Sequence, residues 1–189
     1  RYFNSKIQKN NSDANIYGFS LANGLNNNFN ESIRLIDILL KKYPRNLFLN
    51  TTKVELLTNA GEFKKALKIS DSILEISPKN YPLSIIKARL LLEMKNFLES
   101  EKIIKDQLLR RNDDPQLWLL LSEIHRGGRN IIGYHQSKAE FYLLLGQNEE
   151  ALSQLEFALN LTENNFLISE GILTQITEIK KIIRSTRGL

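Results

Sequence analysis

The sequence has no cysteine among its 189 residues, which excludes disulfides, thiolate metal ligands and cysteine nucleophiles. This absence is compatible with a bacterial periplasm. No stretch approaches the roughly 20 consecutive apolar residues that a membrane-spanning helix needs, so we expect no membrane span. Because the sequence begins with Arg1 rather than Met, we expect it to be a fragment of a longer protein.

Motifs of known catalytic sites are also absent. The sequence has no Walker loop, no G-x-G-x-x-G after a strand, no H-E-x-x-H and no G-x-S-x-G. Its two histidines, His125 and His135, lie on either side of a Gly-Gly pair, and we interpret them as surface or partly buried residues rather than metal ligands. We therefore predict that this chain is not an enzyme and holds no cofactor.

A strong charge of one sign is lacking as well. The formal net charge is +5, but Lys and Arg are scattered among Asp and Glu, and the densest basic run, Lys41-Lys42 with Arg45, is short. No aromatic residues interleave with a basic stripe, as stacking on nucleic acid would require. We therefore predict no nucleic-acid partner.

What the sequence does contain is a 34-residue period. Phe29, Phe63 and Phe97 recur at this interval, and so do Pro44 and Pro78. Two helices in each period of this length are the signature of the tetratricopeptide repeat (TPR). Small residues recur with the same period where the two helices of a unit should cross, since a large side chain there would overpack the crossing. They are Ser32, Ala66 and Ser100.

The period slips after Ser100. Trp118 and Ser122 fit the start of a fourth unit, but the next match, through Ala139, Gly146 and Ala151, is displaced by half a period. Half a period corresponds to one helix. We therefore predict that a helix near residues 131–145 closes the fourth unit and also opens the fifth.

A last helix is predicted near residues 166–185. Its predicted buried face holds Phe166, Leu167, Ile172, Ile176, Ile179 and Ile183. The opposite face is basic, which suits a terminal capping helix that covers the core on one side and meets water on the other.

The sequence therefore predicts an all-α fold, a TPR helical-hairpin solenoid (an α-α superhelix) of about ten helices. A polar lead-in at residues 1–13 is followed by one TPR domain at 14–189. The predicted units span about 13–46, 47–80, 81–114, 115–145 and 132–165, before the capping helix at 166–185.

Such a solenoid has no deep enclosed pocket, and its first helices line a concave surface that suits an extended peptide or a partner's loop. The TPR groove positions give a mixed set of apolar, acidic and basic candidates. They are Tyr17, Leu21, Phe48, Glu55, Asn59, Ile85, Arg89, Glu93, Leu119, Glu123, Arg126, Gln136 and Glu140. TPRs that clamp a chaperone's C-terminal carboxylate use Lys and Asn where this sequence has Tyr17 and Leu21, so we do not expect that mode.

Three groups of residues carry a family resemblance. They are Tyr17–Ala22 with Lys42–Asn46, then Trp118–Glu123, then Ala139–Gly146 with Glu150–Leu152. In this order they resemble the C-terminal TPR tail of periplasmic zinc metalloproteases of the β-barrel assembly-enhancing (BepA-like) type. The similarity covers about residues 14–183, and the predicted helix shared by two units fits it.

The resemblance implies a periplasmic module that recruits outer-membrane β-barrel proteins, or their assembly machinery, for an upstream protease domain. The zinc of that family belongs to the upstream domain, so no catalytic or metal-binding residue is carried over to this chain. Two alternatives stay open. A cytoplasmic TPR adaptor unrelated to proteolysis explains the repeat period but not the half-repeat. A nucleic-acid-binding helical repeat would bind with an affinity that falls steeply with salt.

Overall fold

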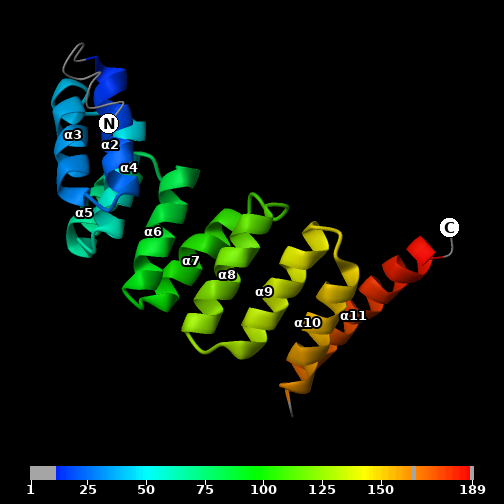
Figure 1. The fold of residues 1–189 in the computed structure, drawn as a ribbon. Helices are drawn as coiled ribbons and strands as arrows, with labels where there is room; N and C mark the ends of the chain where they lie inside the picture. Colours follow the sequence, from blue (N-terminus) through cyan, green and yellow to red (C-terminus); the bar gives the residue numbers. More distant parts are fainter. Residues whose placement is uncertain (1–11, 163–164, 188–189) are drawn as a thin grey trace. The chain divides into compact units, whose positions relative to one another are not determined.

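The computed structural model describes residues 12–162 and 165–187, and all regular elements in these ranges are α-helices (Figure 1). The predicted all-α, TPR-like solenoid is confirmed for this part of the chain. Most of the predicted lead-in at residues 1–13 lies outside the described residues. The ten helices are α2 (Asp13–Leu25), α3 (Phe29–Lys42), α4 (Leu47–Asn59), α5 (Phe63–Ile76), α6 (Tyr81–Glu93), α7 (Phe97–Leu108), α8 (Pro115–Gly127), α9 (Ile131–Leu144), α10 (Asn148–Asn160) and α11 (Phe166–Arg187).

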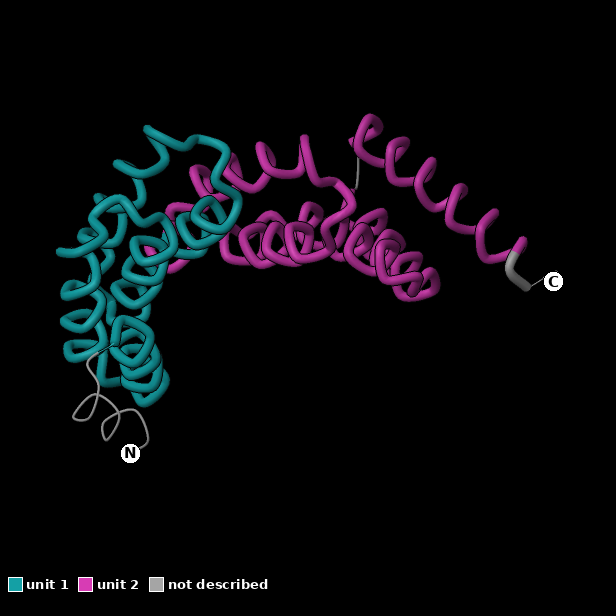
Figure 2. Tube along the Cα trace, turned by 90° about the horizontal axis from the view of Figure 1, so that it is seen from above, with its two compact units in different colours: residues 1–90 teal, residues 91–189 magenta. Residues whose placement is uncertain are grey.

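The helices group into two compact units, residues 1–90 and 91–189 (Figure 2). Within the first unit α2 to α5 pack on one another in chain order, and within the second α7 to α11 do the same. Helices two apart also touch: the ring of Tyr17 on α2 contacts that of Phe48 on α4, and Gln175 of α11 donates a hydrogen bond to Glu140 of α9. Contacts limited to near neighbours along the chain are characteristic of a solenoid.

A capping side chain begins each helix that opens a hairpin. Ser12, Asn46, Asn80 and Asp114 stand one repeat period apart, and each side chain accepts a hydrogen bond from a backbone N–H of the first turn. We call the helices that they cap, α2, α4, α6 and α8, leading helices, and the helices that follow them, α3, α5 and α7, closing helices. The closing helices start without a side-chain cap bond.

A left-handed residue ends each leading helix. Asn27, Gly61, Lys95 and Arg129 have φ angles of 59° to 75° and again stand one repeat period apart. The residue after each donates its backbone N–H to the carbonyl five positions earlier, at 2.8 to 2.9 Å. This is the Schellman ending. It reverses the chain, and α3, α5 and α9 accordingly pack along α2, α4 and α8.

Helix α9 occupies both positions. Like a closing helix, it follows directly after a left-handed residue, Arg129; like a leading helix, it has a capping side chain, Asn130, which accepts from the N–H of Gly133 at 3.0 Å. It ends at left-handed Gly146, half a period after Arg129. Since α9 also packs against both α8 and α10, it closes one hairpin and opens the next.

Small residues on two faces of α9 permit these close contacts. A Cβ added to Gly133 would lie 2.8 Å from Nδ1 of His125 on α8, and the Oγ of Ser137 is 3.1 Å from the same nitrogen. On another face, Ala139 is buried in a cluster with Ala151 and other residues of α10 and α11.

The three small residues predicted at helix crossings, Ser32, Ala66 and Ser100, are completely buried. At the crossing of α2 and α3, the Oγ of Ser32 donates to the carbonyl of Ser20 at 2.7 Å, and the Oγ of Ser20 donates to the carbonyl of Ser32 at 2.9 Å. Both hydroxyls are thereby satisfied without water, which allows the two backbones to approach.

The start of α11 differs from the prediction. Ile172, Ile176 and Ile179 are buried against α10 as expected, but Phe166 is 72% exposed and Leu167 is 81% exposed. The buried contacts of α11 begin only at Ile172, so its first turn has no apolar cluster to join among the described residues. Periodicity identified the correct stripe further along the helix but could not show where the supporting helix begins.

Candidate protein-binding surface

In the first unit, the leading helices α2 and α4 bring two aromatic rings together. The ring of Tyr17 lies 5.2 Å from that of Phe48, measured between centroids, at an interplanar angle of 46°. The Tyr17 hydroxyl is 3.5 Å from the Oγ1 of Thr52, which also lies on α4. Two positions predicted for the groove, on leading helices of successive repeats, are thus in contact.

Apolar side chains around this pair remain open to solvent. Phe48 is 61% exposed, and on α2 Leu21 is 39% and Leu25 is 87% exposed. Leu21 and Leu25 follow Tyr17 at i+4 and i+8, so all three lie on one face of α2. We call Tyr17, Leu21, Leu25 and Phe48 the aromatic patch.

None of the predicted groove residues is buried. The exposed ones are Leu21, Phe48, Glu55, Asn59, Arg89, Glu93 and Arg126. The partly buried ones are Tyr17, Ile85, Leu119, Glu123, Gln136 and Glu140. Of these, the structure brings Tyr17 and Phe48 into contact, whereas Glu140 is engaged by Gln175 of the chain's own α11.

Among the predicted groove residues, Glu140 has a carboxyl whose properties are changed by its surroundings in the fold. Burial raises the pKa of its carboxyl above the ordinary value. The Nε2 of Gln175 donates to its Oε1 at 3.0 Å, while the Oε1 of Gln175 is buried without a hydrogen-bond partner. The carboxyl of Glu140 therefore joins α9 to α11, and a ligand would have to compete with Gln175 for it.

His125 is buried, only 7% exposed, so its interpretation as a surface or partly buried residue was wrong. Its Nε2 lies 3.3 Å from a carboxylate oxygen of Glu101, without hydrogen-bond alignment. A hydrogen bond from Lys105 holds the pKa of Glu101 below its ordinary value, against the effect of burial. His135 is partly buried, as predicted. Residues 12–162 and 165–187 contain no group of three or more His, Cys, Asp or Glu that could hold a metal ion.

An ion pair that recurs with the repeat was not predicted from the sequence. Lys53 of α4 binds Asp37 of α3 at 2.6 Å, and one period later Lys87 of α6 binds Asp71 of α5 at 2.8 Å. Each pair joins a closing helix to the next leading helix. The recurrence of Asp and Lys at the repeat interval was the available signal.

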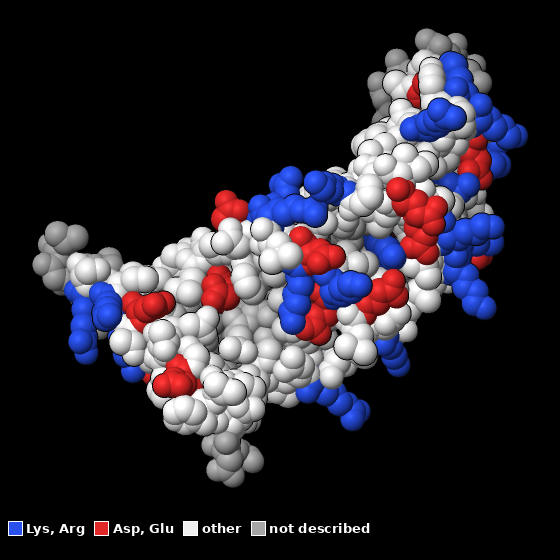
Figure 3. All heavy atoms as spheres, turned by 180° about the vertical axis from the view of Figure 1, so that it is seen from behind, with Lys and Arg blue, Asp and Glu red and all other residues white. Residues whose placement is uncertain are grey.

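Basic and acidic side chains are interspersed on the surface, as the face in Figure 3 shows. Neighbouring charges of opposite sign are paired in several places, for example Arg34 with Glu31 at 2.6 Å and Lys42 with Asp13 at 2.8 Å. This pattern differs from the continuous basic groove that tracks a nucleic-acid backbone. Among the described helices, none combines the length and the apolar character needed to traverse a bilayer.

A sequence model of the tetratricopeptide repeat matches residues 57–124. This range runs from the end of α4 into α8 and contains α5, α6 and α7. No curated protein matches the sequence significantly.

Solved structures with a similar fold include TPR proteins. MamA from Desulfovibrio magneticus RS-1, from its residue 41 to its end, aligns with a TM-score of 0.63 and 14% identity over 92% of this chain and 96% of that chain. A tetratricopeptide repeat protein from Parabacteroides merdae aligns with a TM-score of 0.60 and 16% identity over 93% of this chain and 75% of that one. A thermophilic TPR protein of Thermus thermophilus gives a TM-score of 0.54 and 13% identity over 86% and 98% of the two chains. At these identities the likeness concerns the fold alone.

Proposed function

Because this chain contains a tetratricopeptide repeat domain, we propose that it binds a partner protein through the leading-helix surface of residues 1–90, with the aromatic patch as its anchor. TPR domains are protein-interaction modules, and their leading helices supply the binding surface. The observation that supports this location is the contact between Tyr17 and Phe48, in which the second ring stays 61% exposed.

The chemistry of the patch suits a peptide or an amphipathic helix with apolar anchor residues. Exposed aromatic residues contribute most to binding energy when a partner covers them, because they bury a large area and lose few rotamers. Glu55 and Asn59 continue along α4 beyond the patch, one helical turn apart, and both are exposed. They offer polar contacts beside an apolar centre, as interfaces usually do.

Photo-crosslinking can test this location in cells. A photoreactive residue at Phe48 should capture one defined protein, whereas the same residue at Lys64, an exposed position on closing helix α5, should not. Replacing Tyr17 by Ala in the Phe48 crosslinking variant should reduce the yield of that adduct about tenfold or more, because the remaining aromatic side chain of the patch is lost. Equal capture at both positions would place the binding surface elsewhere.

For the biological setting, we propose that the chain is the recruiting tail of a periplasmic zinc metalloprotease that acts on outer-membrane β-barrel proteins or their assembly machinery. The support is the sequence resemblance through Tyr17–Ala22, Trp118–Glu123 and Ala139–Gly146, together with the half-repeat at α9. Zinc would belong to an upstream domain and not to this chain.

The sequence of the full gene tests the setting directly. A signal peptide and H-E-x-x-H on a helix upstream of Arg1 are required. A cytoplasmic kinase or glycosyltransferase domain in that place would end the proposal and leave the alternative, a cytoplasmic TPR adaptor unrelated to proteolysis. Neither result bears on the aromatic patch, whose test is the crosslinking experiment.

A further inference from the structure

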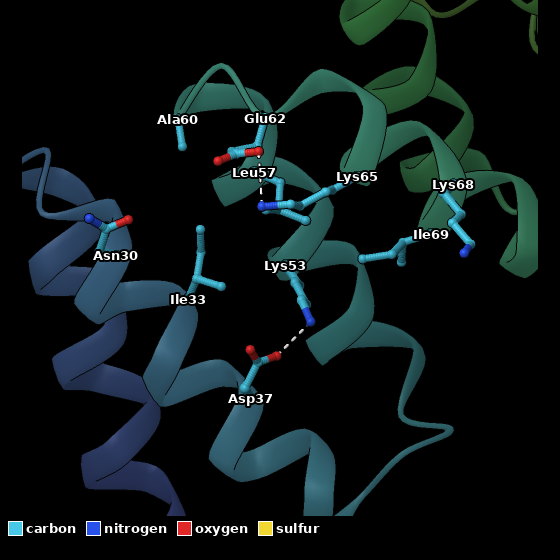
Figure 4. A pocket seen from close by; sticks show the side chains of 10 residues that line it. All are labelled: Asn30, Ile33, Asp37, Lys53, Leu57, Ala60, Glu62, Lys65, Lys68 and Ile69. Atoms are coloured by element: carbon cyan, nitrogen blue, oxygen red, sulfur yellow. Dashed lines mark hydrogen bonds and ion pairs between the residues drawn. The ribbon is translucent and has the colours of Figure 1, made fainter.

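A second candidate site lies in the first unit and is lined by no residue of the aromatic patch. A cavity of about 450 Å³ opens between α3, α4 and α5. Figure 4 shows its lining, in which Ile33 and Ile69 approach from α3 and α5, and Leu57 comes from α4. Leu57 is buried, and the two isoleucines are partly buried. The cavity therefore has an aliphatic interior.

The rim of this cavity has an excess of positive charge. Its two carboxylates are already paired, Asp37 with Lys53 at 2.6 Å and Glu62 with Lys65 at 3.1 Å. Lys68 makes no ion pair with any described residue. Three ammonium groups thus face two carboxylates, and the unpaired one can accept an anion from outside without breaking an existing pair.

Most residues that line the cavity follow the repeat, since Leu57, Lys68 and Ile69 recur one period later as Leu91, Lys102 and Ile103, but some do not. Asp37 and Lys53 recur one period later as Asp71 and Lys87, and this pair joins successive helices. Ala60 is instead followed at that interval by Met94, and Lys65 by Glu99. A methionine in place of Ala60 would occupy part of the space, and a glutamate in place of Lys65 would reverse the charge. The fold therefore does not require Ala60 or Lys65 at these positions.

We propose that the cavity between α3, α4 and α5 binds a peptide segment of a partner protein that presents a carboxylate next to an aliphatic side chain. The aliphatic group enters between Ile33, Leu57 and Ile69, where it loses contact with water. The carboxylate meets Lys68 at the rim. This site goes beyond the binding proposed for the aromatic patch and does not depend on it.

The lining argues against two other ligands. A nucleic acid would bring its phosphates close to Asp37 and Glu62 and would find no aromatic ring among the lining residues to stack on. A divalent cation would have to displace Lys53 and Lys65 from those carboxylates. A single carboxylate beside an apolar group matches both the charge excess and the interior.

The probe for this site is an acetylated and amidated hexapeptide of alternating Leu and Asp, with a peptide of alternating Leu and Asn as its uncharged match. The full chain, labelled at its isoleucine methyl groups, is titrated with each peptide and followed by NMR. We expect the methyl signals of Ile33 and Ile69 to shift saturably with the acidic peptide and to shift much less with the amide peptide. Equal shifts with both peptides, or none at these two residues, would overturn the proposal.

Three variants separate this site from general charge attraction. Lys68→Glu should weaken binding of the acidic peptide about three- to tenfold, as expected for reversing an exposed charge, whereas Lys64→Glu, on the same helix outside the cavity, should change it little. Ala60→Met, which introduces the side chain found at the next repeat, should weaken binding by filling the cavity. Equal losses for Lys68→Glu and Lys64→Glu would show nonspecific attraction and refute the site.

Two controls make the outcome decisive. The three variants are compared with the parent by thermal unfolding, and the exposed positions of Lys64 and Lys68 make unchanged melting the expected result. If Ala60→Met melts lower, the Lys68 and Lys64 pair alone decides. Phe48→Ala should leave binding of the acidic peptide unchanged, so that failure of this site and failure of the aromatic patch are told apart.

Discussion

At the scale of single residues, Glu140 shows how the fold changes the chemistry of a surface candidate. Burial raises the pKa of its carboxyl, so the folded chain holds the proton more tightly than the unfolded chain does. Its neutral form therefore favours folding at pH values below the ordinary glutamate pKa, and this contribution is lost as the pH rises through the raised folded-state value. Beside this carboxyl, the buried Oε1 of Gln175 has no hydrogen-bond donor.

Replacing this carboxyl by its amide should stabilise the protein. In Glu140→Gln the acceptor for Gln175 is retained, the buried charge is removed, and an N–H becomes available for the orphaned oxygen. We expect the free energy of unfolding at neutral pH to rise by about 1 kcal/mol, the typical net value of one hydrogen bond. Urea denaturation at acidic and neutral pH measures this free energy. In the parent it should fall from acidic to neutral pH as Glu140 ionises, and in the variant this fall should be smaller. Glu178→Gln, an exposed change on α11, is the matched control. A variant less stable than the parent at neutral pH would contradict this account.

At the scale of helices, the hairpins follow from signals that are local in sequence. The repeat period places the crossing residues, and caps at Ser12, Asn46, Asn80 and Asp114 place the leading helices. The crossing residues were predicted from the period. The caps were not, although they recur at the same interval and act within one turn. The exposure of Phe166 and Leu167 could not be predicted, because it depends on where α10 stands relative to the first turn of α11.

The cap of α4 gives a quantitative test at this scale. The Oδ1 of Asn46 accepts from the N–H of Leu49 at 3.0 Å. We expect Asn46→Ala to lower the free energy of unfolding by about 1 kcal/mol, because that N–H loses its partner. Asn59→Ala, the same exchange at the exposed end of α4, should change it by less than about 0.5 kcal/mol. Chemical denaturation compares the two, and equal effects would show that the cap bond contributes nothing specific.

At the scale of the whole molecule, a solenoid is stabilised by contacts between near neighbours, so damage should stay local. Ala66 is fully buried where α5 crosses α4. Ala66→Leu should overpack that crossing and cost about 1–3 kcal/mol. Native-state hydrogen exchange should show a larger loss of protection in α4 and α5 than in α9 and α10. A uniform loss across all helices would instead indicate one cooperative unit.

The candidate sites differ in how far the sequence could indicate them. Tyr17 and Phe48 could be predicted because groove positions recur with the repeat, although their mutual contact required the structure. The cavity beside Lys68 was missed because three helices build its lining and the small side chain of Ala60 keeps it open. The periodicity of the sequence predicts which face of a helix is exposed, but it does not predict the volume of a cavity between helices.

The double use of α9 has a consequence for how such a chain can grow or shrink. Arg129 and Gly146 are both left-handed, with φ of 61° and 73°, and the residue after each makes the same backbone hydrogen bond. The turns at Arg129 and Gly146 therefore have the same backbone conformation. Connecting Arg129 directly to Gln147 would delete residues 130–146, and we expect α8 and α10 then to form an ordinary hairpin. The leading helices are even-numbered as far as α8, and the next leading helix is α9. A single additional helix therefore changes which helices lead, while each hairpin is still formed by the same kind of turn.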